Sequence, residues 1–193
     1  MSNGYLGNAG VFLVQVVFGL YILAVMLRFL LQAVRADYYN PLVQALVKLT
    51  NPPLVPLRQI VPGLAGLDLA AVVLLIALQV VELYLVSNLV GLSLPVGTVM
   101  LGAVAKLLDL VLNVYLWTIL IRVIASWVSP NTYHPALQVI DRLTDPVIAP
   151  VRRVLPDLGG LDFSPLVVLV GIQLARMLIV APIMDLSGLP RGL

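Results

Sequence analysis

The sequence predicts an all-α integral membrane protein with four transmembrane helices, and three observations support this fold class. Of the 193 residues, 61% are hydrophobic and only 10% are charged, whereas soluble domains carry about 25% charged residues. The mean hydropathy is +1.08. Four segments are also apolar over the roughly 20 residues that a helix needs to cross the bilayer core. Lipid is therefore the expected solvent for most of the surface.

The four predicted spans are distributed over both halves of the chain. They run approximately over Val11–Val34, Leu69–Val90, Met100–Val128 and Pro165–Asp185. Strands of a transmembrane barrel would alternate polar and apolar residues over about ten positions. These segments do not alternate, so each is expected to form a helix.

Two long connections hold most of the prolines and many of the charges: Arg35–Asp68 and Ser129–Asp162. Within the first, Pro41–Thr50 is expected to form a short amphipathic helix, because Gln44 and Lys48 stand four residues apart on one helical face. Such a helix is too short to span the bilayer, so we expect it in the interface or under the bundle.

Prolines are expected to end these short helices. Asn51-Pro52-Pro53 follows the first one, and proline removes a backbone donor and disfavours the helical conformation of the residue before it. A second apolar piece, Leu54–Val61, ends at Pro62. The connection is thus predicted to contain two short helices separated by the proline pair.

An internal repeat divides the chain into two tandem units, 1–94 and 95–193. Adding 94 to the residue number aligns Arg28–Gln79 with Arg122–Gln173 without a gap, with 18 identities in 52 positions. Lipid-facing helices can match by composition alone, whereas a fixed spacing of proline and arginine cannot. Many of the identities lie in the connections: Tyr39/Tyr133, Pro41/Pro135, Gln44/Gln138, Thr50/Thr144, Pro52/Pro146, Pro56/Pro150, Arg58/Arg152, Pro62/Pro156 and Asp68/Asp162. Each unit is predicted to be a helix, amphipathic connecting helices and a second helix.

The repeats are expected to be parallel, since each contains an even number of spans and both copies enter the membrane in the same direction. Orientation follows from the positive-inside rule. The opposite side offers only Lys106 and Arg191, whereas the connections carry Arg35, Lys48, Arg58, Arg142, Arg152 and Arg153. Both connections are therefore expected in the cytoplasm and both termini outside.

Two ionisable residues at membrane depth are candidate functional residues, because a charge at the bilayer centre costs about 2.5 to 3.5 kcal/mol on insertion scales. Glu82 and Arg176 occupy equivalent positions of the repeats, so we expect an intramembrane ion pair across the pseudo-axis. A structural bridge is favoured over an ion or proton pathway and over snorkelling. Lys106 and Asp109 are expected to form a local pair on one helix.

Arg28 and Arg122 lie about two turns inside the ends of their spans. Each is expected either to snorkel to the headgroups or to reach Asp68 or Asp162. Those aspartates also suit helix N-termini, with Ser164 as an alternative cap in the second repeat. Structural roles are favoured for all four charged residues.

The connections carry a basic belt that anionic lipids would favour by about 1 kcal/mol per residue near the surface. The alternative is recognition of a protein partner, for which the repeated prolines would supply a rigid shape. The belt consists of Lys48, Arg58, Arg142, Arg152 and Arg153, and the prolines are Pro52, Pro56, Pro62, Pro146, Pro150 and Pro156.

Several function classes are disfavoured. The chain has no cysteine and one histidine, so thiol chemistry and a histidine metal cluster are excluded, and no metal or cofactor site is expected. Ser126 and Ser129 lie near His134, but no acid completes a recognisable triad. A net charge of +2 does not indicate a nucleic-acid partner. A non-enzymatic role is therefore expected.

Both connections resemble the signature of the YggT (YlmG) family of bacterial and plastid membrane proteins. The matching strings are NPLVQALVKLTNPPLVPLRQIVP at Asn40–Pro62 and LTDPVIAPVRRVLPDLGGLDFSP at Leu143–Pro165, which share the spacing T-[ND]-P-x-x-x-P-x-R-x-x-x-P. The resemblance implies a bacterial inner-membrane protein without known catalytic activity. It also implies links to osmotic tolerance, to cell-division or nucleoid organisation and, in chloroplast relatives, to assembly of the cytochrome b6f complex.

The expected function is a non-enzymatic organising or assembly factor for other membrane complexes. Its expected partners are anionic lipids and other membrane proteins, with homo-oligomerisation left open. The alternative is an ion or small-solute transport component whose path is lined by Gln79, Glu82, Gln173 and Arg176. A channel needs a continuous polar run through the membrane, and the sparse polar residues favour the organiser.

Overall fold

The computed structural model describes residues 4–63, 66–128, 134–155 and 162–190, and within these ranges the chain is built of helices. Four helical runs are long and apolar enough to span a membrane. They are α1 (Tyr5–Ala33), α3 (Leu69–Leu89), α4 (Val96–Val128) and a final run formed by α6 (Ser164–Ala175), the π-helical segment η1 (Arg176–Val180) and α7 (Ala181–Ser187). This confirms the predicted fold class of a multi-pass helical membrane protein.

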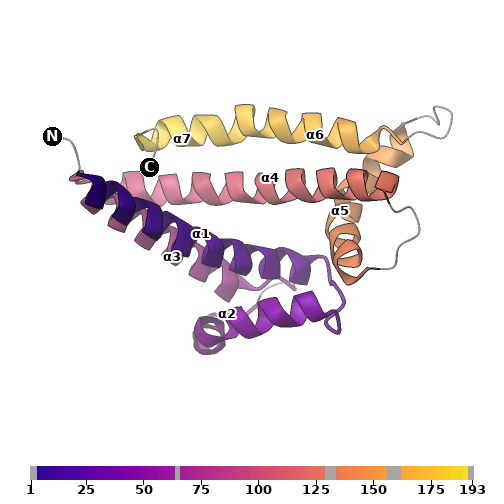
Figure 1. The fold of residues 1–193 in the computed structure, drawn as a ribbon, viewed down its shortest axis with the longest axis horizontal. Helices are drawn as coiled ribbons and strands as arrows, with labels where there is room; N and C mark the ends of the chain where they lie inside the picture. The colour runs from indigo at the N-terminus through magenta and orange to yellow at the C-terminus, as the bar shows by residue number, and fades with distance from the viewer. Residues whose placement is uncertain (1–3, 64–65, 129–133, 156–161, 191–193) are drawn as a thin grey trace.

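The two repeats are parallel. In Figure 1, α1 and α4 run in the same direction, and both ends of the chain lie at one end of the molecule. At the other end lie the two connecting helices, α2 (Pro41–Ile60) and α5 (Pro135–Val154). We call the end with α2 and α5 the loop side, and the opposite end the terminus side.

Helix α4 occupies the centre of the arrangement. It packs against α3 of the first repeat and, on its other side, against α6, η1 and α7. Helix α1 packs mainly on α3 and α2. The largest apolar core joins the loop-side half of α1 to α2 and α3, with Val25, Leu54 and Ala71 fully buried. The two repeats therefore meet chiefly through α3 and α4.

The connecting helices are longer than predicted. Helix α2 is one continuous helix that contains Pro52, Pro53 and Pro56, so the expectation that the proline pair ends a short helix was wrong. Helix α5 likewise contains Pro146 and Pro150. An internal proline removes one backbone hydrogen bond and kinks the helix, and Figure 1 shows α2 and α5 changing direction along their length.

Burial explains why these helices continue through their prolines. Thr50 and Leu54 of α2 are fully buried beside the proline segment, and Thr144 and Ile148 occupy the equivalent places in α5. These side chains hold both halves of each kinked helix against the spans. Of the repeated prolines, Pro62 follows α2, and Pro156 lies outside the described residues.

The last span contains a π-helical turn that the sequence reading did not predict. The N–H of Ala181 donates to the carbonyl of Arg176, five residues earlier. Pro182 follows immediately in the first turn of α7. Because proline cannot donate and its ring crowds the preceding turn, a wider turn before it keeps the span continuous.

Candidate functional site

A threonine–arginine contact ties the first span of each repeat to its connecting helix. Arg28 Nη1 donates to Thr50 Oγ1 at 2.7 Å, and Arg122 Nη1 donates to Thr144 Oγ1 at 2.7 Å. Both threonines are fully buried. Each hydroxyl in turn donates to a carbonyl one turn earlier in its own helix. The same contact thus holds α2 against α1 and α5 against α4.

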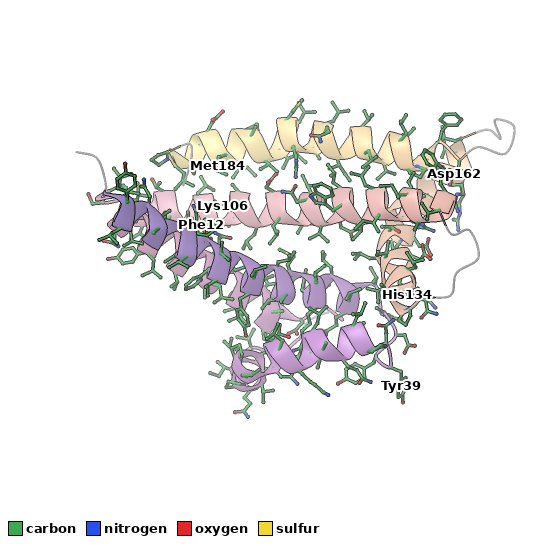
Figure 2. All side chains as sticks on the ribbon, in the orientation of Figure 1. Phe12, Tyr39, Lys106, His134, Asp162 and Met184 are labelled. Atoms are coloured by element: carbon green, nitrogen blue, oxygen red, sulfur yellow. The ribbon has the colours of Figure 1, made fainter. Side chains whose placement is uncertain are left out.

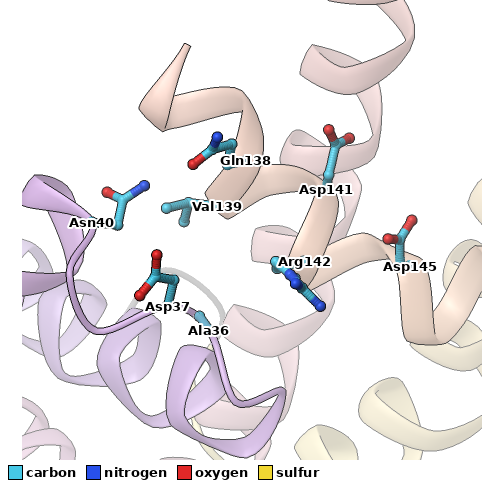
Figure 3. A pocket seen from close by; sticks show the side chains of 8 residues that line it. All are labelled: Ala36, Asp37, Asn40, Gln138, Val139, Asp141, Arg142 and Asp145. Carbon is cyan, nitrogen blue, oxygen red and sulfur yellow. The ribbon is translucent and has the colours of Figure 1, made fainter. Parts of the chain in front are cut away.

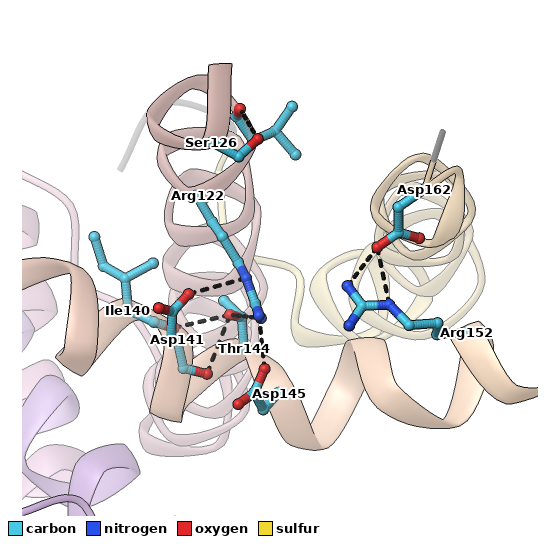
Figure 4. Close-up of polar contacts among 9 residues, drawn as sticks. Arg122, Ser126, Ile140, Asp141, Thr144, Asp145, Arg152 and Asp162 are labelled. Atoms are coloured by element: carbon cyan, nitrogen blue, oxygen red, sulfur yellow. Dashed lines mark hydrogen bonds and ion pairs between the residues drawn. The ribbon is translucent and has the colours of Figure 1, made fainter. Parts of the chain in front are cut away.

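A second repeated contact ties the end of each connecting helix to the start of the next span. Arg58 binds Asp68, and Arg152 binds Asp162 through Nε, at 2.9 Å, and Nη2 (Figure 4). The expectation that Arg28 or Arg122 reaches these aspartates was therefore wrong. Arg28 and Arg122 instead bind Thr50 and Thr144 in the middle of α2 and α5.

The two aspartates also begin the return spans. Asp68 Oδ1 accepts from the N–H of Ala71 at 3.3 Å, and Asp162 Oδ1 accepts from the N–H of Ser164 at 2.9 Å. Partial burial tends to raise the pKa of Asp162, but hydrogen bonds from Ser164 and the guanidinium of Arg152 outweigh this and hold the pKa below its ordinary value. Asp162 is therefore a carboxylate at neutral pH.

The repeats differ in how the arginine of the first span is neutralised. Arg122 binds two carboxylates of α5, Asp141 at 3.0 Å and Asp145 at 2.8 Å (Figure 4). The positions equivalent to these acids in the first repeat are Val47 and Asn51. Arg28, which is only 6% exposed, donates instead to neutral oxygens, those of Thr50 and of the Val47 carbonyl.

The basic belt divides into bound and free members. Arg58 and Arg152 belong to the repeated contacts with aspartate. Lys48, Arg142 and Arg153 are exposed and, among the described residues, form no ion pair. The free cations are thus the part of the belt that is available to lipid or to a protein partner.

Four charged residues form two ion pairs inside the membrane-spanning bundle, and the partners differ from those expected. Lys106 Nζ lies 4.0 Å from Glu82 Oε1, and Arg176 Nε lies 3.0 Å from Asp109 Oδ1. Among the described residues no ion pair joins Glu82 to Arg176 or Lys106 to Asp109, so both predicted pairs were wrong. Figure 2 shows Lys106 far from the loop-side residues Tyr39 and His134.

The position of α4 explains the exchange of partners. This helix lies between α3, which carries Glu82, and η1, which carries Arg176, and α3 and η1 make no contact within the described chain. Helix α4 therefore supplies one counter-charge to each side. Gln79 Nε2 also donates to Glu82, and Asn113 Nδ2 donates to Asp109 at 2.9 Å.

A polar cavity of about 320 Å³ opens between the repeats on the loop side. Figure 3 shows Asp37 and Asn40 of the first repeat opposite Gln138 and Arg142 of α5. Asn40 Nδ2 donates to the carbonyl of Pro135 at 2.8 Å and joins the starts of α2 and α5. Sequence reasoning missed this cavity because its walls come from both repeats, whose packing the repeat pattern does not specify.

The hydroxyl and imidazole groups that were considered for catalysis have local structural partners. His134 Nδ1 accepts from the N–H of Ala136 at the start of α5, and Ser126 Oγ donates to the carbonyl of Val123. Ser129 lies outside the described residues. No group of three metal-binding side chains occurs in the part of the chain that the structure describes.

Comparison with known proteins gives the family. The CCB3/YggT family model matches twice, over residues 7–89 and 101–183, and the two matches are displaced by the same 94 residues as the internal repeat. The chain is 39% identical to an uncharacterized protein of Pseudomonas aeruginosa, over 97% of this chain and 96% of that protein.

Two further relatives agree with this match. An uncharacterized protein of Vibrio alginolyticus is 41% identical, over 91% of this chain and 97% of that protein. The protein YggT of Escherichia coli is 32% identical, over 88% of each chain. No solved structure matches. With two matches to the family model and relatives over most of its length, the chain belongs to the CCB3/YggT family.

Proposed function

We propose that the protein is a non-enzymatic organising or assembly factor of the bacterial inner membrane, which presents a shaped loop-side surface to other membrane proteins. The observation that carries this proposal is the pair of repeated contacts that fix α2 and α5 to the spans. A surface held by the same bonds in both repeats is pre-organised for a partner, which lowers the entropic cost of binding.

The charges on that surface support a protein partner. Lys48, Arg142 and Arg153 are exposed without an ion pair among the described residues. Arg142 and the carboxylate of Asp37 both line the cavity between the repeats. A mixed pattern of charge around a polar cavity favours specific recognition over attraction to a uniformly anionic lipid surface.

The test is co-purification from inner membranes in mild detergent. Wild type is compared with a variant in which Lys48, Arg142 and Arg153 are all changed to Gln. A matched control keeps the charges and exchanges their types: Lys48→Arg, Arg142→Lys and Arg153→Lys. We expect a defined set of membrane proteins with wild type, at least a tenfold loss with the neutral variant, and a smaller loss with the exchanged variant.

Two results would contradict the proposal. One is an identical set of co-purifying proteins from wild type and the neutral variant. The other is restoration of growth of a deletion strain in high-salt medium by the neutral variant as fully as by wild type. Either result would limit the exposed cations to lipid anchoring.

The second candidate function is ion or small-solute transport, which the intramembrane charges favour. The network of intramembrane ion pairs and their hydrogen-bonded neighbours on α4 runs from Lys106 to Asn113, about 10 Å along a helix, against a hydrocarbon core of about 30 Å. Further along α4, the Thr118 hydroxyl donates only to carbonyls of its own helix. That extent supports a structural network rather than a path across the bilayer. Proteoliposome flux that disappears in Glu82→Gln would favour transport instead.

A further inference from the structure

A basic pocket in the first repeat lacks the counter-charge that the second repeat provides internally. The pocket has a volume of about 250 Å³ and lies between the end of α1 and α2. Three guanidinium groups line it, those of Arg28, Arg35 and Arg58. Asp68 neutralises Arg58, and within the described chain no carboxylate pairs with Arg28 or Arg35.

The second repeat serves as an internal comparison. There, Asp141 and Asp145 bind Arg122 directly. Their equivalents, Val47 and Asn51, carry no charge. A buried charge is expensive unless it is paired, and Arg28 is only 6% exposed. The first repeat therefore keeps the arginine and the threonine of the contact but has no acid in the equivalent positions.

The backbone at Arg35 provides an independent observation. Arg35 follows the end of α1 with φ of +52°, and it is the one non-glycine residue with positive φ in the described chain. This helix-ending position is ordinarily taken by glycine, and a residue with a side chain is strained there. The conformation turns the chain toward α2 and leaves the Arg35 side chain lining the pocket.

The position of the pocket selects a lipid as the source of the anion. Helix α1 has 29 residues and is about 44 Å long, which exceeds the hydrocarbon core of about 30 Å. The helix is therefore longer than the core, and because the pocket lies at its loop-side end with Arg28 and Arg35, we infer that the pocket is at headgroup level. The rest of the lining is partly apolar, with Leu31, Val43 and Leu46 beside the guanidinium groups.

We propose that this pocket binds the phosphate group of an anionic glycerophospholipid headgroup. Guanidinium groups bind phosphate oxygens through paired, charge-assisted hydrogen bonds, and the phosphate takes the place that Asp141 and Asp145 fill in the second repeat. The site is distinct from the exposed cations of the belt, because Lys48, Arg142 and Arg153 do not line it. It is independent of the proposed organising function.

The test titrates the full-length protein in a nonionic detergent. The probes are dihexanoylphosphatidylglycerol, the phosphatidylcholine of the same chain length and inorganic phosphate, and the readouts are the melting temperature and isothermal calorimetry. We expect saturable stabilisation by phosphatidylglycerol, with at least tenfold weaker responses to phosphatidylcholine and to inorganic phosphate.

Variants locate the site. Val47→Asp with Asn51→Asp gives the first repeat the acids of the second, so we expect unchanged folding and at least a tenfold weaker response to phosphatidylglycerol. Val47→Asn is the matched control, because it adds polarity without charge and should keep the response. Arg35→Gln changes an exposed side chain and provides a second variant whose folding is not at risk.

Each remaining outcome overturns the proposal. A full response to phosphatidylglycerol in both the double aspartate variant and Arg35→Gln would place lipid binding elsewhere. An equal response to inorganic phosphate would assign the pocket to a free anion rather than to a lipid. An equal response to phosphatidylcholine would show that headgroup charge does not determine binding.

Discussion

At the scale of single residues, the internal repeat preserves the bonds that hold the connecting helices in place. Arginine, threonine, arginine and aspartate recur in register, and in both copies the first arginine binds the threonine and the second binds the aspartate. Sequence reasoning singled out the four arginines and the two aspartates but noted the threonines only as identities of the repeat, and its alternative that Arg28 or Arg122 reaches an aspartate was wrong. Spacing along the chain does not specify which arginine is nearer once α2 and α5 continue through their prolines.

The unequal neutralisation of Arg28 and Arg122 leads to an asymmetric prediction. Thr50→Val removes an acceptor from a buried guanidinium that has no carboxylate partner among the described residues, so we expect a loss of about 1 to 3 kcal/mol of stability. Thr144→Val should cost less, because Arg122 keeps Asp141 and Asp145. Reversible unfolding in mixed micelles measures both.

Thr118→Val is the matched control for these variants. The Thr118 hydroxyl donates only within its own helix, to the carbonyls of Val114 and Tyr115, so its loss should be nearly neutral. Equal destabilisation by Thr50→Val and Thr144→Val would contradict the idea that the acids of α5 compensate.

The intramembrane charges give a second prediction at this scale. Glu82→Gln and Lys106→Met should each leave a partner charge uncompensated, at a cost of up to about 3 to 5 kcal/mol, and the double variant should lose less than the sum. Glu82→Gln and Arg176→Gln should instead add within about 0.5 kcal/mol, as residues without shared contacts do. Thermal unfolding in detergent provides the stabilities of wild type and these five variants, and coupling between Glu82 and Arg176 would contradict the observed pairing.

The intramembrane site also shows that equivalent positions in two repeats do not suffice to predict which residues are in contact. Equivalent residues in parallel repeats share a depth, which is why Glu82 and Arg176 were expected to meet. Depth alone does not determine contact, because a third helix can lie between two others. Here α4 separates α3 from η1, and this packing depends on side-chain shape along all three helices rather than on any motif.

At the scale of elements, the prolines of α2 and α5 act within helices rather than at their ends. The local rule that proline ends a helix failed because burial of Thr50 and Leu54 compensates for the lost hydrogen bonds. The limits of the four spans were predicted to within four residues, since length and hydropathy determine them, except that α1 begins at Tyr5, six residues before the predicted Val11. The π-helical turn was missed, although Pro182, which cannot donate and crowds the turn before it, is a local feature that accounts for it.

Replacing Pro53 and replacing Pro56 of α2 should therefore change the stability of the protein differently. Pro53 has valine as its equivalent in the second repeat, whereas Pro56 is matched by Pro150. Pro53→Val should be neutral or stabilising, because the variant regains a backbone donor. Pro56→Ala should straighten the helix two residues before Arg58 and weaken the bond to Asp68, at a cost of roughly 1 kcal/mol.

A double-mutant cycle checks that mechanism. Pro56→Ala combined with Asp68→Asn should cost less than the sum of the single changes, because both act on the same contact. Chemical unfolding of the four proteins in mixed micelles gives the coupling. Strict additivity would show that Pro56 does not position Arg58.

At the scale of the whole molecule, the even number of spans in each repeat predicted the parallel arrangement, and both connecting helices do lie at one end (Figure 1). The internal repeat of the sequence did not predict how the two repeats pack against each other. The contact between α3 and α4 and the polar cavity between the start of α2 and α5 arise from both copies at once. A repeated sequence predicts the helices within each unit, but two units with the same helices can still pack against each other in many ways.

The final prediction concerns orientation in the membrane. Because the free and bound cations of α2 and α5 gather on the loop side, the positive-inside rule places that side in the cytoplasm. The chain has no cysteine, so single cysteines report their own location. Tyr39 and Val154 are 85% and 84% exposed on the loop side, and Tyr5 and Val96 are 96% and 79% exposed on the terminus side.

In spheroplasts, an impermeant maleimide should label Tyr5→Cys and Val96→Cys at once and should label Tyr39→Cys and Val154→Cys only after permeabilisation. The four sites test the orientation of the molecule and the parallel arrangement of the repeats separately. Label on both loop-side positions and neither terminus-side position would reverse the orientation but keep the fold. Label on Tyr39→Cys without Val154→Cys would contradict the parallel repeats themselves, because α2 and α5 must then face opposite compartments and could not share the bond between Asn40 and Pro135.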